Sequence, residues 1–236
     1  MFRWFFKWLL RLFLLAVALV VIFLLSLNSI LRVLIEHNIR AQTGMDAEIG
    51  RFKLGWTAPA IEIQDLKIYN TAAFGGAPFL DIPEIHAEYD RAALLKKQIH
   101  LTLLRFNLAE LDIVKNQNGQ MNVFVFSKAP RKHHGTPATA PPSFKKQTGY
   151  DFRGIDALNV SFNRARFIDL KNPNNDREQT IGIQNLVIPH VKSANDLTFL
   201  VVMIDLRSNH FFDALIGSPQ HSAPLESIVN LIGITF

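Results

Sequence analysis

The chain has 236 residues, of which 49% are hydrophobic and 19% charged, so it is long enough to bury a core in one or two domains. Its formal net charge is +5, and much of the basic excess lies near the N-terminus and in one proline-rich segment, so no nucleic-acid partner is indicated. The chain has no cysteine, which excludes disulfides, zinc–thiolate sites and thiol catalysis.

The N-terminal segment has the composition of a membrane anchor. From Leu12 to Leu27 it carries no charge, and Ser26 is its only polar residue. As a helix this run measures about 24 Å, and the apolar residues before it extend it toward the roughly 30 Å of a hydrocarbon core. Basic and tryptophan side chains at its start are typical of the membrane interface: Arg3, Trp4, Lys7, Trp8 and Arg11.

No acidic residue precedes Glu36, so the positive-inside rule predicts a cytoplasmic N-terminus with the residues after about Leu31 on the far side. The alternative is a cleaved signal peptide, which also has a basic start and an apolar middle. No small-residue cleavage site follows the apolar run, and the apolar helical pattern continues through Leu34 and Ile35. The sequence therefore favours an uncleaved anchor with a helical extension over residues 1–40.

From Gly44 the apolar residues follow the period of two that is typical of strands. Residues 44–126 are predicted to form a meander of short strands, antiparallel because the connections are short. The alternation slips by one residue between Ile63 and Leu66, and similar slips recur further along. Each slip requires a bulge or bend to keep the apolar side chains on one face.

Residues 127–149 are rich in proline, small and basic residues and show no apolar period, which predicts a linker or exposed loop. The adjacent histidines His133 and His134 lack a third ligand, so no metal site is predicted there. Strand signals resume over residues 150–217, where KNPNND predicts the turn of a hairpin.

A helix is predicted over residues 194–216, because Ser193 and Asp196 resemble a capping box and Gly217 and Pro219 supply a stop. Its apolar stripe is expected to cover the sheet, and the alternative is a helix lying on a membrane surface. Residues 218–236 are assigned to a C-terminal tail, and the sequence is compatible with a final strand, a short helix or a docking segment there. The predicted class is α+β, mainly β: an N-terminal transmembrane helix, a curved antiparallel sheet or groove, and a C-terminal amphipathic helix.

One phrase occurs twice in the chain. Residues 61–70 and 181–190 both follow the pattern I-x-I-Q-[D/N]-L-x-I. Strand propensity explains the isoleucines and leucines, whereas the shared polar step favours two copies of a strand–bulge–strand unit in one sheet. A curved sheet of such units forms a trough that suits an acyl chain unless a helix fills it.

The N-terminal half of the chain resembles the AsmA-like family. The resemblance covers residues 1–125 well and 150–217 more loosely. Four features behind the single N-terminal helix carry it: T-G-x-x-A-x-I-G at residues 43–50, a strand pair ending at Asn70, the leucine pair Leu94 and Leu95, and N-x-x-G-x-x-N at residues 116–122.

The resemblance implies an inner-membrane anchor and a periplasmic β-rich groove. Members of this family are associated with outer-membrane biogenesis and phospholipid traffic, and they are distant relatives of bridge-like lipid-transfer proteins. Typical members are far longer than this chain, so one copy is too short to bridge two membranes. The chain is therefore expected to assemble with other subunits, or with further copies of itself, or to act locally.

No sequence motif for catalysis is found: there is no G-x-S-x-G, H-E-x-x-H, P-loop or G-x-G-x-x-G. The carboxylates of DIPEIHAEYD fall on the polar face of a strand and are expected to be solvated. His86 and His100 have no evident partner. The sequence predicts a protein that is not an enzyme and that uses no cofactor and no metal.

The resulting hypothesis is a protein whose apolar strand faces shield phospholipid acyl chains from water, at about 0.8 kcal/mol per buried methylene. The alternative is a structural subunit that holds a larger envelope complex together, with its trough filled by the 194–216 helix. The candidate lining residues are Ile61, Ile63, Leu66, Ile68, Ile99, Leu101, Leu103, Phe106, Ile181, Ile183, Leu186 and Ile188.

Overall fold

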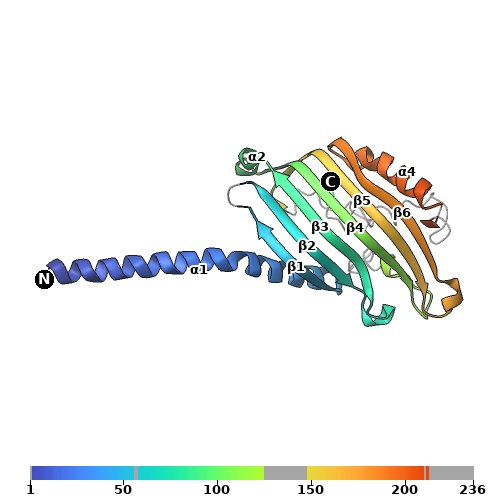
Figure 1. Cartoon of the computed structure of the whole chain (residues 1–236), viewed down its shortest axis with the longest axis horizontal. Coiled ribbons are helices and arrows are strands. Elements are labelled where there is room, and N and C mark those ends of the chain that lie inside the picture. The colour runs from blue at the N-terminus through green and yellow to red at the C-terminus, as the bar shows by residue number, and fades with distance from the viewer. Residues whose placement is uncertain (1, 56–57, 125–147, 210, 213–236) are drawn as a thin grey trace, which may run out of the picture.

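The computed structural model describes residues 2–55, 58–124, 148–209 and 211–212. A long N-terminal helix, α1 (Phe2–Thr43), leads into a six-stranded sheet, and α4 (Thr198–Arg207) lies beside the last strand (Figure 1). The predicted class is confirmed in its main features: an apolar N-terminal helix, a largely β fold and a C-terminal helix.

The strands follow one another across the sheet in chain order. They are β1 (Asp46–Leu54), β2 (Ala60–Tyr69), β3 (Pro78–Tyr89), β4 (Gln98–Lys115), β5 (Asp151–Asp169) and β6 (Arg177–Val191). Short elements lie between them: η1 (Ala72–Phe74), α2 (Arg91–Leu95), η2 (Asn122–Phe124) and η3 (Pro173–Asn175). A further short element, η4 (Ala194–Leu197), joins β6 to α4. At about 3.3 Å per residue, β4 and β5, with 18 and 19 residues, each run for about 60 Å.

The sheet is mixed, so the prediction of an antiparallel sheet is wrong for one strand pair. All neighbouring strands are antiparallel except β4 and β5, which pair in parallel from Gln98 with Asp151 to Lys115 with Asp169. A parallel pair requires a connection of a dozen or more residues, and residues 116–150 provide it. The strands β1–β4 of the predicted segment 44–126 and the strands β5 and β6 of the predicted segment 150–217 therefore lie in one continuous sheet. Most of the predicted linker, 127–149, lies outside the described residues.

Helix α1 ends at Thr43 because Gly44 adopts a left-handed conformation, with φ of 72°, and its N–H donates to the carbonyl of Arg40 at 2.8 Å. The chain then reverses, and β1 runs back along the C-terminal part of α1. Three contacts fix this alignment: Asp46 with Arg40 at 3.1 Å, the Ile49 N–H donating to Glu36 Oε1 at 2.8 Å, and the Leu54 N–H donating to Asn28 Oδ1 at 3.2 Å.

The first copy of the repeated phrase contains the predicted irregularity. Asp65 has φ of 54°, a left-handed conformation that aspartate and asparagine tolerate better than most residues. Through it, Ile63 and Leu66 both face the core, although they are three residues apart. The pairing of β2 with its neighbours places Asp65 opposite Gly50 on one side and Pro83 on the other. The irregularity therefore continues across three adjacent strands.

The second copy repeats this feature at the same level of the sheet. Asn185 has φ of 48°, and its N–H donates to Ser161 Oγ at 3.0 Å where the β5–β6 register shifts. Phe162, next to Ser161, pairs with Leu108 of β4, and the β3–β4 register sets Leu108 opposite Pro83. Both copies thus interrupt the alternation along one row, and the long strands follow curved paths in Figure 1.

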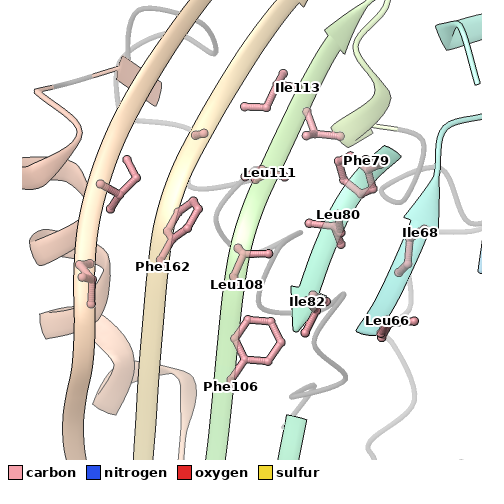
Figure 2. Packing of buried hydrophobic residues seen from close by; sticks show 14 of the residues in the cluster. Leu66, Ile68, Phe79, Leu80, Ile82, Phe106, Leu108, Leu111, Ile113 and Phe162 are labelled. Atoms are coloured by element: carbon pink, nitrogen blue, oxygen red, sulfur yellow. The ribbon is translucent and has the colours of Figure 1, made fainter. Parts of the chain in front are cut away.

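One face of the sheet is apolar across all six strands, and it is called the apolar face below. Figure 2 shows side chains from β2, β3, β4 and β5 meeting there, including Leu66, Leu80, Phe106 and Phe162. Two buried clusters make up this face, the larger one containing Leu111 and the smaller one running from β4 to β6. Because each slip in alternation is compensated in the neighbouring strand, the apolar face is continuous.

The opposite face carries ion pairs between neighbouring strands. Arg166 of β5 binds Asp112 of β4 through two hydrogen bonds, and Arg164 and Arg166 both pair with Glu110. Burial raises the pKa of Asp112, while the hydrogen bond to Asp112 raises the pKa of Arg166 above its ordinary range. The guanidinium therefore remains charged, and the two faces of the sheet differ sharply in polarity.

The helix predicted over residues 194–216 is interrupted in the structure. Its first part is η4 followed by α4, which ends at Arg207; Asn209, with φ of 51°, follows, and residues 211–212 are again helical. The predicted N-terminal signal is confirmed, because the Asp196 carboxylate accepts hydrogen bonds from the Lys192 and Ser193 N–H groups, each at 2.8 Å. The stop assigned to Gly217 and Pro219 and the tail 218–236 lie outside the described residues.

Candidate functional site

The structure brings ten of the twelve candidate lining residues together on the apolar face. Buried in its clusters are Leu66, Ile68, Phe106, Ile181, Ile183 and Ile188. Half-buried and packed against the clusters are Ile61, Ile63, Leu101 and Leu186.

Two candidates do not join them. Ile99 and Leu103 belong to neither cluster. The face assigned to Leu103 is wrong, because its neighbour Leu104 is buried in the smaller cluster and successive strand residues point to opposite faces. Leu103 thus shares the polar face with Arg105, which pairs with Glu84 at 3.1 Å.

Several central residues of the apolar face were not among the candidates. Leu111 and Ile113 are fully buried in the larger cluster, and Leu80, Ile82 and Leu108 lie beside them (Figure 2). The alternation of these apolar residues with polar ones in the sequence could have identified them as facing the core. Only the pairing of β3 with β4 shows that they continue the row begun by the repeated phrase.

Helices flank the apolar face at both edges. On the β1 side, Leu31, Ile35 and Ile39 of α1 pack against the larger cluster. On the β6 side, Met203 and Ile204 of α4 pack against the same cluster. The side of α4 that faces away from the sheet is also apolar, with the stripe formed by Phe199, Val202 and Leu206 exposed.

One end of the sheet lies close to the apolar part of α1. Residues Phe6–Phe23 form a stretch long and apolar enough to cross a membrane, and none of it is buried. The last residue of β1, Leu54, binds Asn28, which directly follows the uncharged run of α1 that ends at Leu27. We call this end of the sheet the α1-proximal end.

The strand pairing shows which residues of the other strands lie at the α1-proximal end. The Tyr89 N–H donates to the Pro59 carbonyl at 2.9 Å, and Tyr89 pairs with Leu101. Leu101 in turn pairs with Ile155, and Ile155 with Val191. Figure 1 accordingly shows α2 and the adjoining strand ends on the side of the sheet toward the N-terminal half of α1.

The interfacial residues predicted near the N-terminus lie on the exposed surface of α1. Trp4 and Trp8 contact each other edge to face, with ring centroids 5.9 Å apart, and Lys7 and Arg11 are exposed beside them. The side chain of Arg3 lies outside the described part of the chain.

The histidines of the sheet have carboxylate partners, contrary to the sequence-based expectation. His86 Nε2 lies 3.2 Å from Glu88, and His100 Nε2 lies 2.9 Å from Asp156. Asp90 lies 4.0 Å from the other ring nitrogen of His100, beside a polar hollow of about 250 Å³ that also contains Lys96. Among the described residues no group of three or more metal-ligating side chains occurs, and His133 and His134 lie outside them.

The motif at residues 116–122 holds the far end of β4. The Asn116 side-chain oxygen accepts from the Asn118 and Gln120 N–H groups, and Gly119 adopts φ of 77° to complete the turn. Fully buried Asn122 then binds the carbonyl of Asp112 and the N–H of Val114, at 2.8 and 2.9 Å, as a neighbouring strand would. These residues are structural.

Comparison with protein-family models, with curated proteins and with solved structures finds no match to this chain.

Proposed function

We propose that this chain is a non-catalytic protein anchored in the inner membrane by α1, with its sheet in the periplasm, and that its apolar face shields or transfers phospholipid acyl chains in envelope biogenesis. The proposal extends the resemblance to AsmA-like proteins. One observation carries it: an apolar face six strands wide reaches the level at which α1 leaves its apolar stretch.

The anchor is supported by the composition of α1 and by the exposure of its apolar stretch. The stretch Phe6–Phe23 is not buried, and no element of the described part of the chain covers its side chains. Exposing that many apolar side chains to water is unfavourable, at roughly 25 cal/mol per Å² of apolar surface. A bilayer removes this cost, and the basic residues at the start favour a cytoplasmic N-terminus.

The carrier role is supported by the difference between the two faces of the sheet. The apolar face consists of branched and aromatic side chains, most of them buried, and follows β4 and β5 for about 60 Å, whereas the opposite face holds the Arg164 and Arg166 ion pairs. In this proposal the interruptions at Asp65 and Asn185 curve the sheet into a groove between α1 and α4. An acyl chain in that groove would be stabilised by about 0.8 kcal/mol per buried methylene.

A second candidate function is a structural subunit of a larger envelope complex, or of a homo-oligomer. The exposed stripe formed by Phe199, Val202 and Leu206 on α4 favours it, because these residues recur on one side of the helix and no described element covers them. In that case the apolar face is an ordinary core, and α4 is the contact with a protein partner.

Native mass spectrometry of the full chain in detergent tests the two functions. For the carrier, phospholipid is expected to co-purify and to be lost in Leu186→Asp, which places a charge on the apolar face. It should be retained in the matched control Val187→Asp, since Val187 is 56% exposed on the other face. Circular dichroism verifies that both variants keep the sheet.

A chain without lipid whose protein partner is lost in Phe199→Asp would contradict the carrier role and support the structural one. Equal lipid content in the Leu186 and Val187 variants would also contradict it, because lipid bound only around α1 does not distinguish the two faces of the sheet.

A further inference from the structure

A short basic segment with two exposed leucines closes the α1-proximal end of the sheet. Residues 91–97 read RAALLKK and contain three basic residues and no acidic one. Leu95 is 88% exposed and Leu94 is 39% exposed, whereas Ala93 of the same turn is buried. The helix therefore packs its alanine inward and presents its leucines outward.

The segment is held in this orientation by several hydrogen bonds. Asp90 caps α2, its carboxylate accepting from the Ala92 and Ala93 N–H groups at 2.7 and 3.3 Å. After the helix, Lys97 adopts φ of 57°, and its carbonyl accepts from the Asp151 N–H at 2.9 Å, which ties the segment to the start of β5. The leucines thus project from an ordered support.

The position of this segment puts it next to the bilayer. The Asp90 N–H donates to the His100 carbonyl, and the preceding residue Tyr89 is bonded to Pro59 in the turn after β1. The end of β1 is in turn bonded to Asn28, which directly follows the uncharged run of α1 that ends at Leu27. With that run in the hydrocarbon core, Asn28 and the end of β1 lie at the level of the headgroup layer, which is about 5–8 Å thick.

We propose that α2 docks on the anionic phospholipid surface of the membrane that α1 spans, with Leu94 and Leu95 at the boundary of the acyl chains and Lys96 and Lys97 on the lipid phosphates. Exposed leucines flanked by lysines are the chemistry of an interfacial segment. The inference rests on the proposed function and deepens it, because docking would seat the end of the apolar face at the lipid surface.

A membrane fits this segment better than a protein partner does. Two leucines form a small apolar patch, whereas a stable protein interface needs about 800 Å² on each side. The positive charge is complementary to anionic headgroups, and the anchor holds the segment beside them without a separate association step. The same arrangement gives the exposed leucines the cover that the fold does not provide.

Single-cysteine labelling tests the docking, since the chain has no cysteine of its own. The variant Leu95→Cys carries an environment-sensitive fluorophore, and the control Asn174→Cys carries it in η3 at the opposite end of the sheet. The full chain is reconstituted into phosphatidylcholine vesicles with and without phosphatidylglycerol, and both sets contain brominated lipid as a quencher.

The expected result is loss of most of the fluorescence at position 95 in phosphatidylglycerol vesicles and little loss at position 174. Charge reversal by Lys96→Glu with Lys97→Glu should reduce quenching at position 95 to the level of the control. Flotation with the vesicles measures anchoring by α1 independently of the fluorophore.

If the chain floats but the fluorophore at position 95 is quenched no more than the one at position 174, the docking is overturned and the anchor is left intact. A chain that does not float would overturn the anchor as well. A fluorescence shift at position 95 without quenching by lipid would assign the leucines to a contact with a second copy of the chain and overturn the proposal. Equal quenching with and without phosphatidylglycerol would overturn the preference for anionic lipid.

Discussion

Gly50→Ala tests whether the interruption of the sheet depends on the pairing of Gly50 with Asp65. A Cβ at position 50 would lie 2.9 Å from Asp65 Cβ, 3.1 Å from Asp65 Oδ2 and 3.3 Å from the Gln64 carbonyl. Overpacking of this kind costs about 1–3 kcal/mol. Replacing glycine also restricts the unfolded chain, which stabilises the fold by roughly 0.4–1 kcal/mol. The clash is the larger effect, so Gly50→Ala should lower the free energy of unfolding.

The Asp65→Gly background should reverse this result. Glycine adopts the φ of 54° at position 65 readily and removes both of the closest clashing atoms. Of the three atoms nearest to a Cβ at position 50, the Gln64 carbonyl oxygen at 3.3 Å then remains, so Gly50→Ala should become neutral or stabilising. Thermal unfolding of the full chain in detergent, followed by circular dichroism, measures both effects, at roughly 2–4 °C per kcal/mol for a chain of this size. The same decrease in Tm in both backgrounds would refute the reasoning.

Three further predictions concern single side chains. Asn122→Ala leaves the Asp112 carbonyl and the Val114 N–H without their partner, so it should lower the free energy of unfolding by about 2–4 kcal/mol. The control Asn118→Ala, in the exposed turn, should lower it by less than about 0.5 kcal/mol. Equal effects of the two variants in chemical unfolding would contradict a structural role for the motif. Glu36→Ala removes the acceptor of the Ile49 N–H, whereas the control Glu36→Gln keeps an acceptor oxygen. Hydrogen exchange at the Ile49 amide should therefore be faster in the alanine variant than in the glutamine variant. Equal exchange rates in the two variants would argue against the alignment of β1 on α1. Burial tends to raise the pKa of Asp169, but hydrogen bonds from Asn175, Lys171 and Asn172 outweigh it and leave that pKa below its ordinary value. The stability contributed by Asp169 is therefore present above its unfolded pKa of about 3.9 and is lost as the pH falls through the lower pKa of the folded state. Asp169→Asn should therefore make Tm less dependent on pH on the acid side of a Tm–pH profile. An unchanged profile would contradict this.

The repeated phrase shows what alternation in a sequence can predict. The polar step in each copy was expected to mark a bulge or bend, and the left-handed conformations of Asp65 and Asn185 confirm an irregularity there. The alignment of Asp65 with Gly50 and Pro83 could not be predicted, because it depends on the register between strands that are distant in sequence. A one-residue change of register would have separated them.

The parallel pairing of β4 with β5 was not predicted for a different reason. The antiparallel prediction rested on short connections between strands, whereas the connection over residues 116–150 is long enough for either direction of return. This pairing sets Leu108 beside Phe162 and makes the apolar face continuous. Leu103 was misassigned because Leu103 and Leu104 are both apolar, so alternation cannot tell which of them faces the core.

The exposed leucines of α2 illustrate a third limit. Leu94 and Leu95 were recognised as a motif, but composition gives no depth relative to a membrane. That depth follows from hydrogen bonds between segments distant in sequence, above all the bond from Leu54 to Asn28.

Photocrosslinking from adjacent positions on opposite faces tests the central claim most directly. Benzoylphenylalanine is placed at Leu186, which packs against both clusters of the apolar face, or at Val187, which is exposed on the other face. The full chain is irradiated in native membranes and its adducts are identified by mass spectrometry. The carrier role predicts a phospholipid adduct at position 186 and none at 187. Protein adducts without lipid at position 186, or equal lipid adducts at both, would contradict it.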